Sequence, residues 1–299
     1  MSIYLEKMED VAALQPVVEK LAGMGSFEAY RFCDDFADIH KRYDVFKIVY
    51  SGGTAILKQY EEAPEAFECE KKIYQMFPAE APVPRVLGFS DGFMMTEYIP
   101  GDDLKKTTDE TAAAAGRSVA EIMNAFPFDR EYDRTDADKL IARRKERAEF
   151  LKNEPLLRDA YAVYLDRLKE MPLTMGNGDF LPINCIYTGE RVYIIDWEFG
   201  GFLPYALDIA RFIAHGGEDG RYTYRMTDKQ KQIFVDAIYE NMKMKPDRKT
   251  FERDVQMALL DELVIILRRY LENPEEERGE EYRLYYERAK KAAGEILKK

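Results

Sequence analysis

The sequence predicts an α+β protein built as two lobes, a small and mainly β N-terminal lobe at residues 1–98 and a larger, mainly helical C-terminal lobe at residues 99–299. At 299 residues, of which 46% are hydrophobic, the chain is long enough to bury a large core and to form both lobes. The first lobe shows short strand-like runs around a single helical stretch, whereas long helical patterns follow Pro100 and Gly101. This change of pattern places the lobe boundary near Ile99–Asp103.

Two hairpins and one helix are expected in the first lobe, from about residue 27 to residue 99. Gly52 and Gly53 separate the strand-like runs VFKIVY and TAILKQY, and glycine can adopt the positive φ that a tight hairpin turn needs. A second turn is expected at Ser90-Asp91-Gly92, between RVLGF and FMMTEYI. The helix is expected between the hairpins, because the apolar residues of PEAFECEKKIYQMF fall on one side of a helix.

Composition excludes several classes of function. The 56 acidic and 44 basic residues give a net charge of -12, which argues against nucleic acid or an anionic membrane as the main partner and favours a cationic ligand. The three cysteines show no CxxC spacing, so neither a disulfide framework nor a zinc site is predicted, and reduced thiols fit a cytoplasmic protein. No apolar run is long enough to indicate secretion or membrane spanning.

Glu70 is an anomaly in the predicted helix, because it falls among the apolar residues. It lies three residues after Phe67 and four before Tyr74, whereas the other charged residues of the helix fall outside this stripe. A buried carboxylate needs a cation, and Lys58 in the strand TAILKQY is the obvious candidate. The pattern alone favours a plainer interpretation, in which Glu70 lies at the edge of the stripe and reaches water while Lys58 faces solvent.

The loop NGDFLPIN, residues 177–184, interrupts the helical pattern of the second lobe and leads into the hairpin NCIYTGERVYIIDWE. Its residues are common in turns, but Asp179 and Asn184, near its two ends, both carry side-chain oxygen atoms. A three-residue turn at Gly189–Arg191 would place Asn184 opposite Asp196, whereas a two-residue turn would point them to opposite faces. In the first case two oxygen ligands would converge as Mg²⁺ requires, and Asp179 would remain free to accept a proton.

These residues resemble the catalytic elements of the protein-kinase fold. Asp179 and Asn184 match the D-x-x-x-x-N of the catalytic loop, and Asp196 stands at the place of the metal-binding Asp that follows it. The short spacing is similar to that of the aminoglycoside phosphotransferase and choline kinase family, which reads HGDxxxxN, a short hairpin, IDWE or IDFE, and then D-[LI]-A. This chain reads NGDFLPIN, IIDWEFGG and PYALDIA in the same order.

Two further stretches of the first lobe extend the resemblance, which covers about residues 40–215. FMMTEYIPG resembles the hinge between the lobes of that family, and VPRVLGF resembles the strand before it. The loop that covers the phosphates would lie at residues 34–43, DDFADIHKRY, where no GxGxxG occurs. The resemblance therefore implies a bilobal, protein-kinase-like fold.

In the first lobe the resemblance implies a nucleotide site. Lys58 would contact the α and β phosphates of ATP or GTP, and Glu70 would hold Lys58, which reverses the plainer interpretation of this pair. Glu97, Tyr98 and Ile99 would form the hinge, whose backbone would meet the purine.

In the second lobe the resemblance implies the catalytic residues. Asp179 would orient the acceptor hydroxyl and take its proton, and Asn184 and Asp196 would hold Mg²⁺ against the phosphates. Asp208, in the segment LDIA, would brace the catalytic loop without touching the substrate. Asn177 stands where the family has His, and it can still donate a hydrogen bond to the backbone.

The predicted function is that of an ATP- or GTP-dependent phosphotransferase acting on a hydroxyl of a small molecule, most like an aminoglycoside phosphotransferase. An alternative from another class is a nucleotide-binding pseudokinase that serves as an interaction module, motivated by Asn177. Retention of the remaining site residues speaks against this alternative. Neither nucleic acid nor a membrane is expected as a partner.

The acceptor is predicted from carboxylates in the late helical stretch DVQMALLDELVIILRRYL. Glu262 falls on its apolar face, and a buried acid needs a partner. It is expected to pair with Arg268 or Arg269, or alternatively to line an acceptor pocket with Glu198 and Asp261 and attract an amine. The second possibility predicts an amino-bearing hydroxyl compound such as an aminoglycoside, with choline, ethanolamine or an amino sugar as alternatives.

Overall fold

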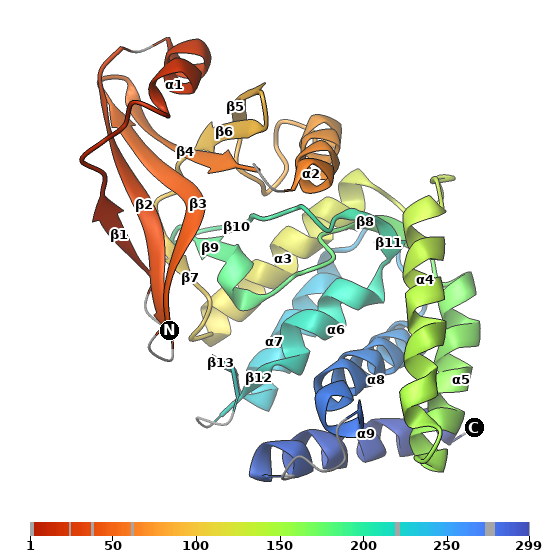
Figure 1. The fold of residues 1–299 in the computed structure, drawn as a ribbon. Helices are drawn as coiled ribbons and strands as arrows, with labels where there is room; N and C mark the ends of the chain where they lie inside the picture. The colour runs from red at the N-terminus through yellow and green to blue at the C-terminus, as the bar shows by residue number, and fades with distance from the viewer. Residues whose placement is uncertain are drawn as a thin grey trace. The chain divides into compact units, whose positions relative to one another are not determined.

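The computed structural model describes residues 3–23, 25–36, 39–60, 63–218, 222–272 and 279–298. The chain divides into two compact units. Unit 1 comprises Met1–Gly101 together with Trp197–Phe199, and unit 2 comprises Asp102–Asp196 and Gly200–Lys299. The fold is α+β as predicted, with the antiparallel sheet in unit 1 and most helices in unit 2 (Figure 1).

Unit 1 is built on an antiparallel sheet of six strands in the order β1-β2-β3-β4-β6-β5. The strands are β1 (Ile3–Lys7), β2 (Phe27–Phe36), β3 (Ile39–Tyr50), β4 (Gly53–Gln59), β5 (Val86–Ser90) and β6 (Phe93–Glu97), and the helices are α1 (Gln15–Ala22) and α2 (Pro64–Met76). The expected phosphate-covering stretch at residues 34–43 lies partly outside the described residues.

Both predicted hairpins of unit 1 are confirmed. β3 and β4 join through Ser51 and Gly52. β5 and β6 join through Asp91 and Gly92, whose φ angles of 46° and 80° are the left-handed values that a two-residue hairpin turn requires. Local turn chemistry therefore accounts for the β5–β6 turn.

The two faces of the sheet in unit 1 have different tasks. Ala55 and Leu57 on β4 are fully buried in a core that α1 completes with Val17 and Val18. Because side chains alternate along a strand, Lys58 points to the opposite face of the sheet from Leu57. The opposite face carries Lys58 beside its partner on β6, the buried Met94.

Unit 2 is mainly helical. Its helices are α3 (Asp109–Ala125), α4 (Thr135–Arg147), α5 (Pro155–Glu170), α6 (Ala206–Ala214), α7 (Asp228–Asn241), α8 (Arg248–Glu272) and α9 (Glu280–Leu297), with the short 3-10 turns η1 (Ala148–Leu151) and η2 (Pro182–Asn184). Helix α3 packs on α7, and α8 packs on both α6 and α9. None of the helices within the described ranges combines the length and the apolar composition needed to cross a bilayer.

Short strands connect these helices and carry the loops of interest. β8 (Leu173–Gly176) pairs with β11 (Gly201–Pro204), and β9 (Cys185–Tyr187) lies between β10 (Val192–Ile194) and β7 (Asp102–Asp103). β12 (Gly216–Gly217) and β13 (Tyr224–Arg225) form a parallel pair.

The hairpin β9–β10 has the two-residue turn, not the three-residue turn that would have brought the two metal-ligand candidates opposite each other. Val192 pairs with Tyr187, which leaves Thr188 and Arg191 as the last pair and Gly189 at the turn. Gly189 has a φ of 98°, a backbone conformation that lets the shorter turn close.

Asn184 therefore lies opposite Ile195, and of the two registers that the sequence left open, the one that faces Asn184 toward Asp196 does not occur. The N–H of Ile195 donates to the carbonyl of Asn184 at 3.0 Å. Asp196 follows with a φ of 63°, so the chain leaves the strand path at this residue. Strand alternation no longer decides the direction of the Asp196 side chain, because alternation holds only for extended backbone.

Candidate active site

Lys58 and Glu70 form an ion pair, as the family resemblance implied. Lys58 Nζ lies 2.9 Å from Glu70 Oε2, and the Glu70 side chain is only 1% exposed. The hydroxyl of Tyr60 also donates to Oε2, and the N–H of Trp197 donates to Oε1 at 2.9 Å. Lys58 Nζ lies 3.2 Å from Oε2 of Glu198 as well. The buried carboxylate is thus satisfied by several donors, as a desolvated charge must be.

The segment Trp197–Phe199 belongs to unit 1 through these contacts. The Trp197 ring is 1% exposed and meets Phe77 edge-on, with the ring centroids 4.7 Å apart. The structure places Glu198, predicted as an acceptor-binding residue, beside Lys58 in unit 1, whereas Asp261 and Glu262 belong to unit 2.

The predicted hinge residues Glu97, Tyr98 and Ile99 lie at the end of strand β6 and directly after it. The N–H of Glu97 donates to the carbonyl of Arg85 at 2.9 Å, and the Glu97 carboxylate accepts from the N–H of Arg85 at 2.8 Å. Lys47 Nζ lies 4.4 Å from the centroid of the Tyr98 ring, and Ile99 is buried. Contact of this backbone with a purine stays a prediction.

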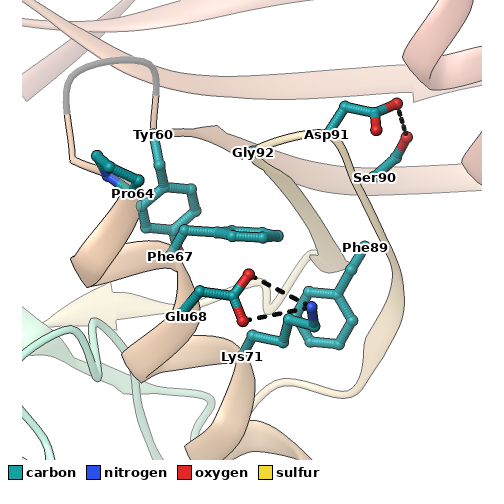
Figure 2. A pocket seen from close by; sticks show the side chains of 9 residues that line it. All are labelled: Tyr60, Pro64, Phe67, Glu68, Lys71, Phe89, Ser90, Asp91 and Gly92. Atoms are coloured by element: carbon teal, nitrogen blue, oxygen red, sulfur yellow. Dashed lines mark hydrogen bonds and ion pairs between the residues drawn. The ribbon is translucent and has the colours of Figure 1, made fainter.

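A cavity of about 620 Å³ lies in unit 1 beside the ring of Tyr60 (Figure 2). The rings of Tyr60, Phe67 and Phe89 line it, with centroid separations of 5.4 Å and 6.2 Å along this series. Lys71 and Glu68 lie 3.5 Å apart in its wall. Tyr60 therefore forms part of a cavity wall while its hydroxyl holds Glu70.

The loop after β8 in unit 2 is held by its own amide side chains. Asn177 is 1% exposed, and its Nδ2 donates to the carbonyls of Ile195 and Asp196 at 3.2 Å and 2.9 Å. Its Oδ1 accepts from the N–H of Asp179 at 3.1 Å, and Nδ2 of Asn184 donates to the carbonyl of Asp179 at 2.9 Å. Asn177 therefore donates to backbone, as predicted for this position.

Asp208 braces the loop from α6, which confirms its predicted role. Its carboxylate accepts from the N–H of Asn177 at 2.5 Å and from the N–H of Gly178 at 3.0 Å. Burial raises the pKa of Asp208 from 3.8 to about 6, although the two backbone N–H groups act in the opposite direction. Gly178 has a φ of 77°, which glycine adopts without strain, and the loop can thus turn both N–H groups toward one carboxylate.

Asp179 is bound by Arg211, a residue that the sequence analysis missed. Arg211 Nε lies 2.8 Å from Asp179 Oδ1, Nη2 contacts the same oxygen, and Nη1 lies 2.9 Å from Oε2 of Glu262. Burial alone would lower the pKa of Arg211, but the carboxylates of Glu262 and Asp179 outweigh it and raise the pKa. One signal was available: Arg211 and Asp208 are the only charged residues of α6, ALDIARFIA.

Glu262 has a different partner from the two arginines that were predicted. Its side chain is 4% exposed and pairs with Arg211. His215 Nε2 lies 3.9 Å from the same carboxylate oxygen. Arg268 lies instead over the ring of Phe150, 4.6 Å from its centroid, and the side chain of Arg269 lies outside the described part of the chain. The expectation failed because helical spacing places Glu262 on the apolar face of its helix but does not show which other helix packs against that face.

Asp261, also predicted to bind the acceptor, is fully buried. Oδ1 accepts from Tyr161 at 2.7 Å and contacts Nη1 of Arg147 at 2.5 Å, and Oδ2 lies 2.7 Å from Nε of Arg144 and 3.2 Å from the hydroxyl of Tyr164. Burial would raise the pKa of Asp261, but the two guanidinium groups outweigh it and lower the pKa. This carboxylate joins helices α4, α5 and α8.

A family model and several solved structures resemble this chain. Residues 40–241, more than half of the chain, match the model of the phosphotransferase enzyme family, APH. None of the curated proteins matches the sequence.

Three solved structures share the fold at low sequence identity. The choline kinase of Streptococcus pneumoniae is 15% identical, with a TM-score of 0.60 over 95% of this chain and 99% of that one. An aminoglycoside phosphotransferase of Alicyclobacillus acidocaldarius is 16% identical, with a TM-score of 0.55 over 85% and 89%. A spectinomycin phosphotransferase in complex with ADP and its antibiotic is 14% identical, with a TM-score of 0.53 over 95% and 97%.

At these identities the likeness concerns the fold, which is the α+β protein-kinase-like fold that the sequence predicted. The family match is independent of it and covers the loop of Asp179, the hairpin β9–β10 and helix α6. The chain therefore belongs to the phosphotransferase enzyme family, APH, whose members phosphorylate small molecules.

Proposed function

We propose that the chain is a kinase that uses ATP or GTP to phosphorylate a hydroxyl group of a small molecule. The observation that carries this proposal is the way Asp179 is held. Asn177 and Asn184 bind its backbone N–H and carbonyl, and Arg211 binds Oδ1, whereas Oδ2 has no hydrogen-bond partner within the described residues. A fixed carboxylate with one open oxygen can orient an acceptor hydroxyl and receive its proton.

In the proposed reaction the acceptor oxygen attacks the γ-phosphorus of the nucleotide. The new O–P bond forms as the bond from that phosphorus to the β–γ bridging oxygen breaks, and its electron pair leaves with the nucleoside diphosphate. The proton of the acceptor hydroxyl passes to Oδ2 of Asp179. Positioning and charge neutralisation supply most of the catalysis, because the transition state spreads its charge over the γ-phosphoryl oxygens.

Asn184 and Asp196 are the proposed ligands of Mg²⁺. Asn184 is 8% exposed and uses Nδ2 on the carbonyl of Asp179, so Oδ1 is the atom that it can offer to a ligand. An amide oxygen and a carboxylate suit Mg²⁺, which prefers oxygen ligands and keeps several waters. When bound, the ion neutralises charge on the phosphates. Asn184 at the same time holds the loop that carries Asp179.

In unit 1, Lys58 is proposed to bind the α and β phosphates of the nucleotide. Glu70 orients Lys58, because it is buried and fixed by Tyr60 and Trp197. The backbone of Glu97–Ile99 is proposed to meet the purine. Kinases of this family use ATP, and the ADP in the spectinomycin phosphotransferase structure supports a nucleotide as the phosphoryl donor.

The proposed acceptor is an amino-bearing hydroxyl compound of the aminoglycoside type, with choline, ethanolamine or an amino sugar as the alternative. Two observations support a cationic acceptor: the net charge of -12, and the names of structural relatives, which act on choline and on aminoglycosides. We also propose that the enzyme works in the cytoplasm, where its free cysteines would stay reduced.

A phosphoryl-transfer screen tests this function. The assay measures phosphoryl transfer from ATP or GTP, in the presence of Mg²⁺, to aminoglycosides, choline, ethanolamine and amino sugars. Asp179→Asn is expected to bind ATP as the wild type does in calorimetry but to lose about 100-fold or more in kcat, because it cannot take the proton. A wild type that binds nucleotide and phosphorylates none of these compounds would point to a pseudokinase. Unchanged turnover in Asp179→Asn would remove Asp179 as the base.

A further inference from the structure

We propose that Arg211, anchored by Glu262, is a positioning residue that holds one oxygen of Asp179 and leaves the other to the acceptor hydroxyl. This inference rests on the proposed function of Asp179 as the base. It assigns roles to Arg211 on helix α6, which no sequence motif indicated, and to Glu262, which was predicted to pair with an arginine or to line the acceptor pocket.

The first step is the geometry of the guanidinium group. Two of its nitrogens, Nε and Nη2, contact the same oxygen, Oδ1 of Asp179, and the third, Nη1, lies 2.9 Å from Glu262 Oε2. A planar guanidinium that is held through all three nitrogens has a fixed orientation. Asp179 is thereby bound on one side only.

The second step is a comparison with the other buried arginine–carboxylate contacts of unit 2. Arg167 grips Asp254 with one nitrogen on each oxygen, Nε on Oδ1 at 2.7 Å and Nη2 on Oδ2 at 2.8 Å. Both oxygens of Asp261 are likewise occupied. These carboxylates are 1% and 0% exposed and serve helix packing, whereas the Asp179 side chain is 23% exposed and keeps Oδ2 free of hydrogen bonds to the described residues. The one-oxygen grip, with the second oxygen left open, therefore separates the candidate base from Asp254 and Asp261.

The third step concerns Glu262, whose side chain is 4% exposed on helix α8. A carboxylate this deeply buried offers almost no surface to an acceptor ammonium, and it needs a cation of its own. Arg211 is that cation, so Glu262 acts on the reaction through Arg211. Glu262 on α8, Arg211 on α6 and Asp179 in its loop thus form a continuous chain of hydrogen-bonded ion pairs.

The experiment compares Arg211→Gln, Arg211→Lys, Glu262→Gln and the double variant Arg211→Gln/Glu262→Gln with the wild type. Turnover is measured with the acceptor that the screen above shows to be phosphorylated fastest. If none is phosphorylated, ATP hydrolysis, in which water is the acceptor, is measured instead. Arg211→Gln and Glu262→Gln are each expected to lower kcat about 10- to 100-fold with KM for ATP unchanged, because a misplaced base slows transfer without weakening nucleotide binding. Arg211→Lys is expected to recover part of the loss, and the double variant to be no slower than Arg211→Gln alone.

Arg167→Gln is the matched control. It breaks an arginine–carboxylate pair between α5 and α8, whose buried acid, Asp254, lies on the same helix as Glu262 and does not contact Arg211. It is therefore expected to lower Tm while kcat of the folded protein stays at the wild-type value. Tm values of all variants separate loss of fold from loss of positioning, and Arg211→Lys and Glu262→Gln keep the test open if Arg211→Gln does not fold.

The outcomes distinguish this inference from the proposed function. Loss of turnover in Asp179→Asn together with wild-type kcat in Arg211→Gln would overturn the positioning role alone. Equal losses of kcat in Arg167→Gln and Arg211→Gln at matched Tm would also overturn it, because the effect would then be structural. Full turnover in Asp179→Asn, or no transfer by the wild type to water or to any acceptor, would remove the proposed function and the inference with it.

Discussion

Asn177 ties the loop of Asp179 to the backbone of Asp196. Its Nδ2 lies 2.9 Å from the carbonyl oxygen of Asp196, and its Oδ1 accepts from the N–H of Asp179 at 3.1 Å. A side-chain amide can make both bonds because it carries a donor and an acceptor in one plane. The candidate base and a candidate metal ligand are thus held by one side chain.

Asn177→Asp is expected to lower the free energy of unfolding by about 1–3 kcal/mol, because a buried carboxylate would face the carbonyls of Ile195 and Asp196 without a donor. It is also expected to lower kcat about tenfold or more, because the loop loses its fixed position. Urea unfolding and steady-state kinetics measure the two effects.

Asn124→Asp is the control for this prediction. The Asn124 amide makes the same kind of double contact, donating to the carbonyl of Asn241 at 2.9 Å and accepting from the N–H of Lys243 at 2.8 Å, but it joins α3 to the end of α7. It is expected to lose stability and keep kcat. A similar loss of kcat in both variants would contradict a specific role of Asn177.

The pKa of Asp208 predicts that stability falls as the pH rises from about 4 to about 6. Burial raises this pKa from 3.8 to about 6, so the unfolded chain releases the proton at a lower pH than the folded protein does. Raising the pH through this window favours the unfolded state by up to about 3 kcal/mol, and no further change is expected above it. Urea unfolding of the wild type and Asp208→Asn at several pH values checks this. A difference between the two that does not vary with pH would contradict it.

Tyr60→Phe is expected to weaken the Lys58–Glu70 pair while the aromatic ring stays in place. It removes the hydroxyl that donates to the buried Oε2 of Glu70, and loss of a hydrogen bond to a buried charge costs about 1.5–3 kcal/mol. Tyr30→Phe is the control, because its hydroxyl donates to the exposed carboxylate of Glu28. Chemical unfolding should show the larger loss for Tyr60→Phe, and equal losses would argue against the buried contact.

Lys58→Met is expected to weaken ATP binding about tenfold, because a charge-assisted contact with phosphate is lost. The rise in Tm that ATP produces should shrink accordingly, since stabilisation by a ligand follows its affinity. Lys20→Met, which removes a lysine paired with Asp91 at the surface of unit 1, is the control and should keep the full rise. An undiminished rise in Lys58→Met would take Lys58 out of the proposed nucleotide site.

Much of unit 1 could be predicted because its signals are local. The turn at Asp91 and Gly92 needs residues that tolerate positive φ, and the sequence supplies them. Lys58 and Glu70 are 12 residues apart; helix periodicity singled out Glu70, but the pattern alone favoured solvent exposure of both residues, and only the family resemblance indicated that they pair. The family motifs then singled out the loop of Asp179 in unit 2.

Other features depend on packing that the order of residues does not reveal. Arg211 meets partners 32 and 51 residues away, and no short-range pattern connects them. The stretch around Gly189 suits a two-residue turn as well as a three-residue one, so the register of β9–β10 was open. The grouping of Trp197–Phe199 with unit 1 arises from contacts with Glu70 and Phe77, far back along the chain.

Tyr60 carries a consequence for protein engineering. Its ring forms part of the wall of the cavity in Figure 2, while its hydroxyl holds Glu70. Any smaller residue at this position would enlarge the cavity and take the phenol away from the carboxylate in the same step. Libraries that reshape the cavity should therefore leave position 60 untouched and vary Phe67 and Phe89, whose rings have no polar group to lose.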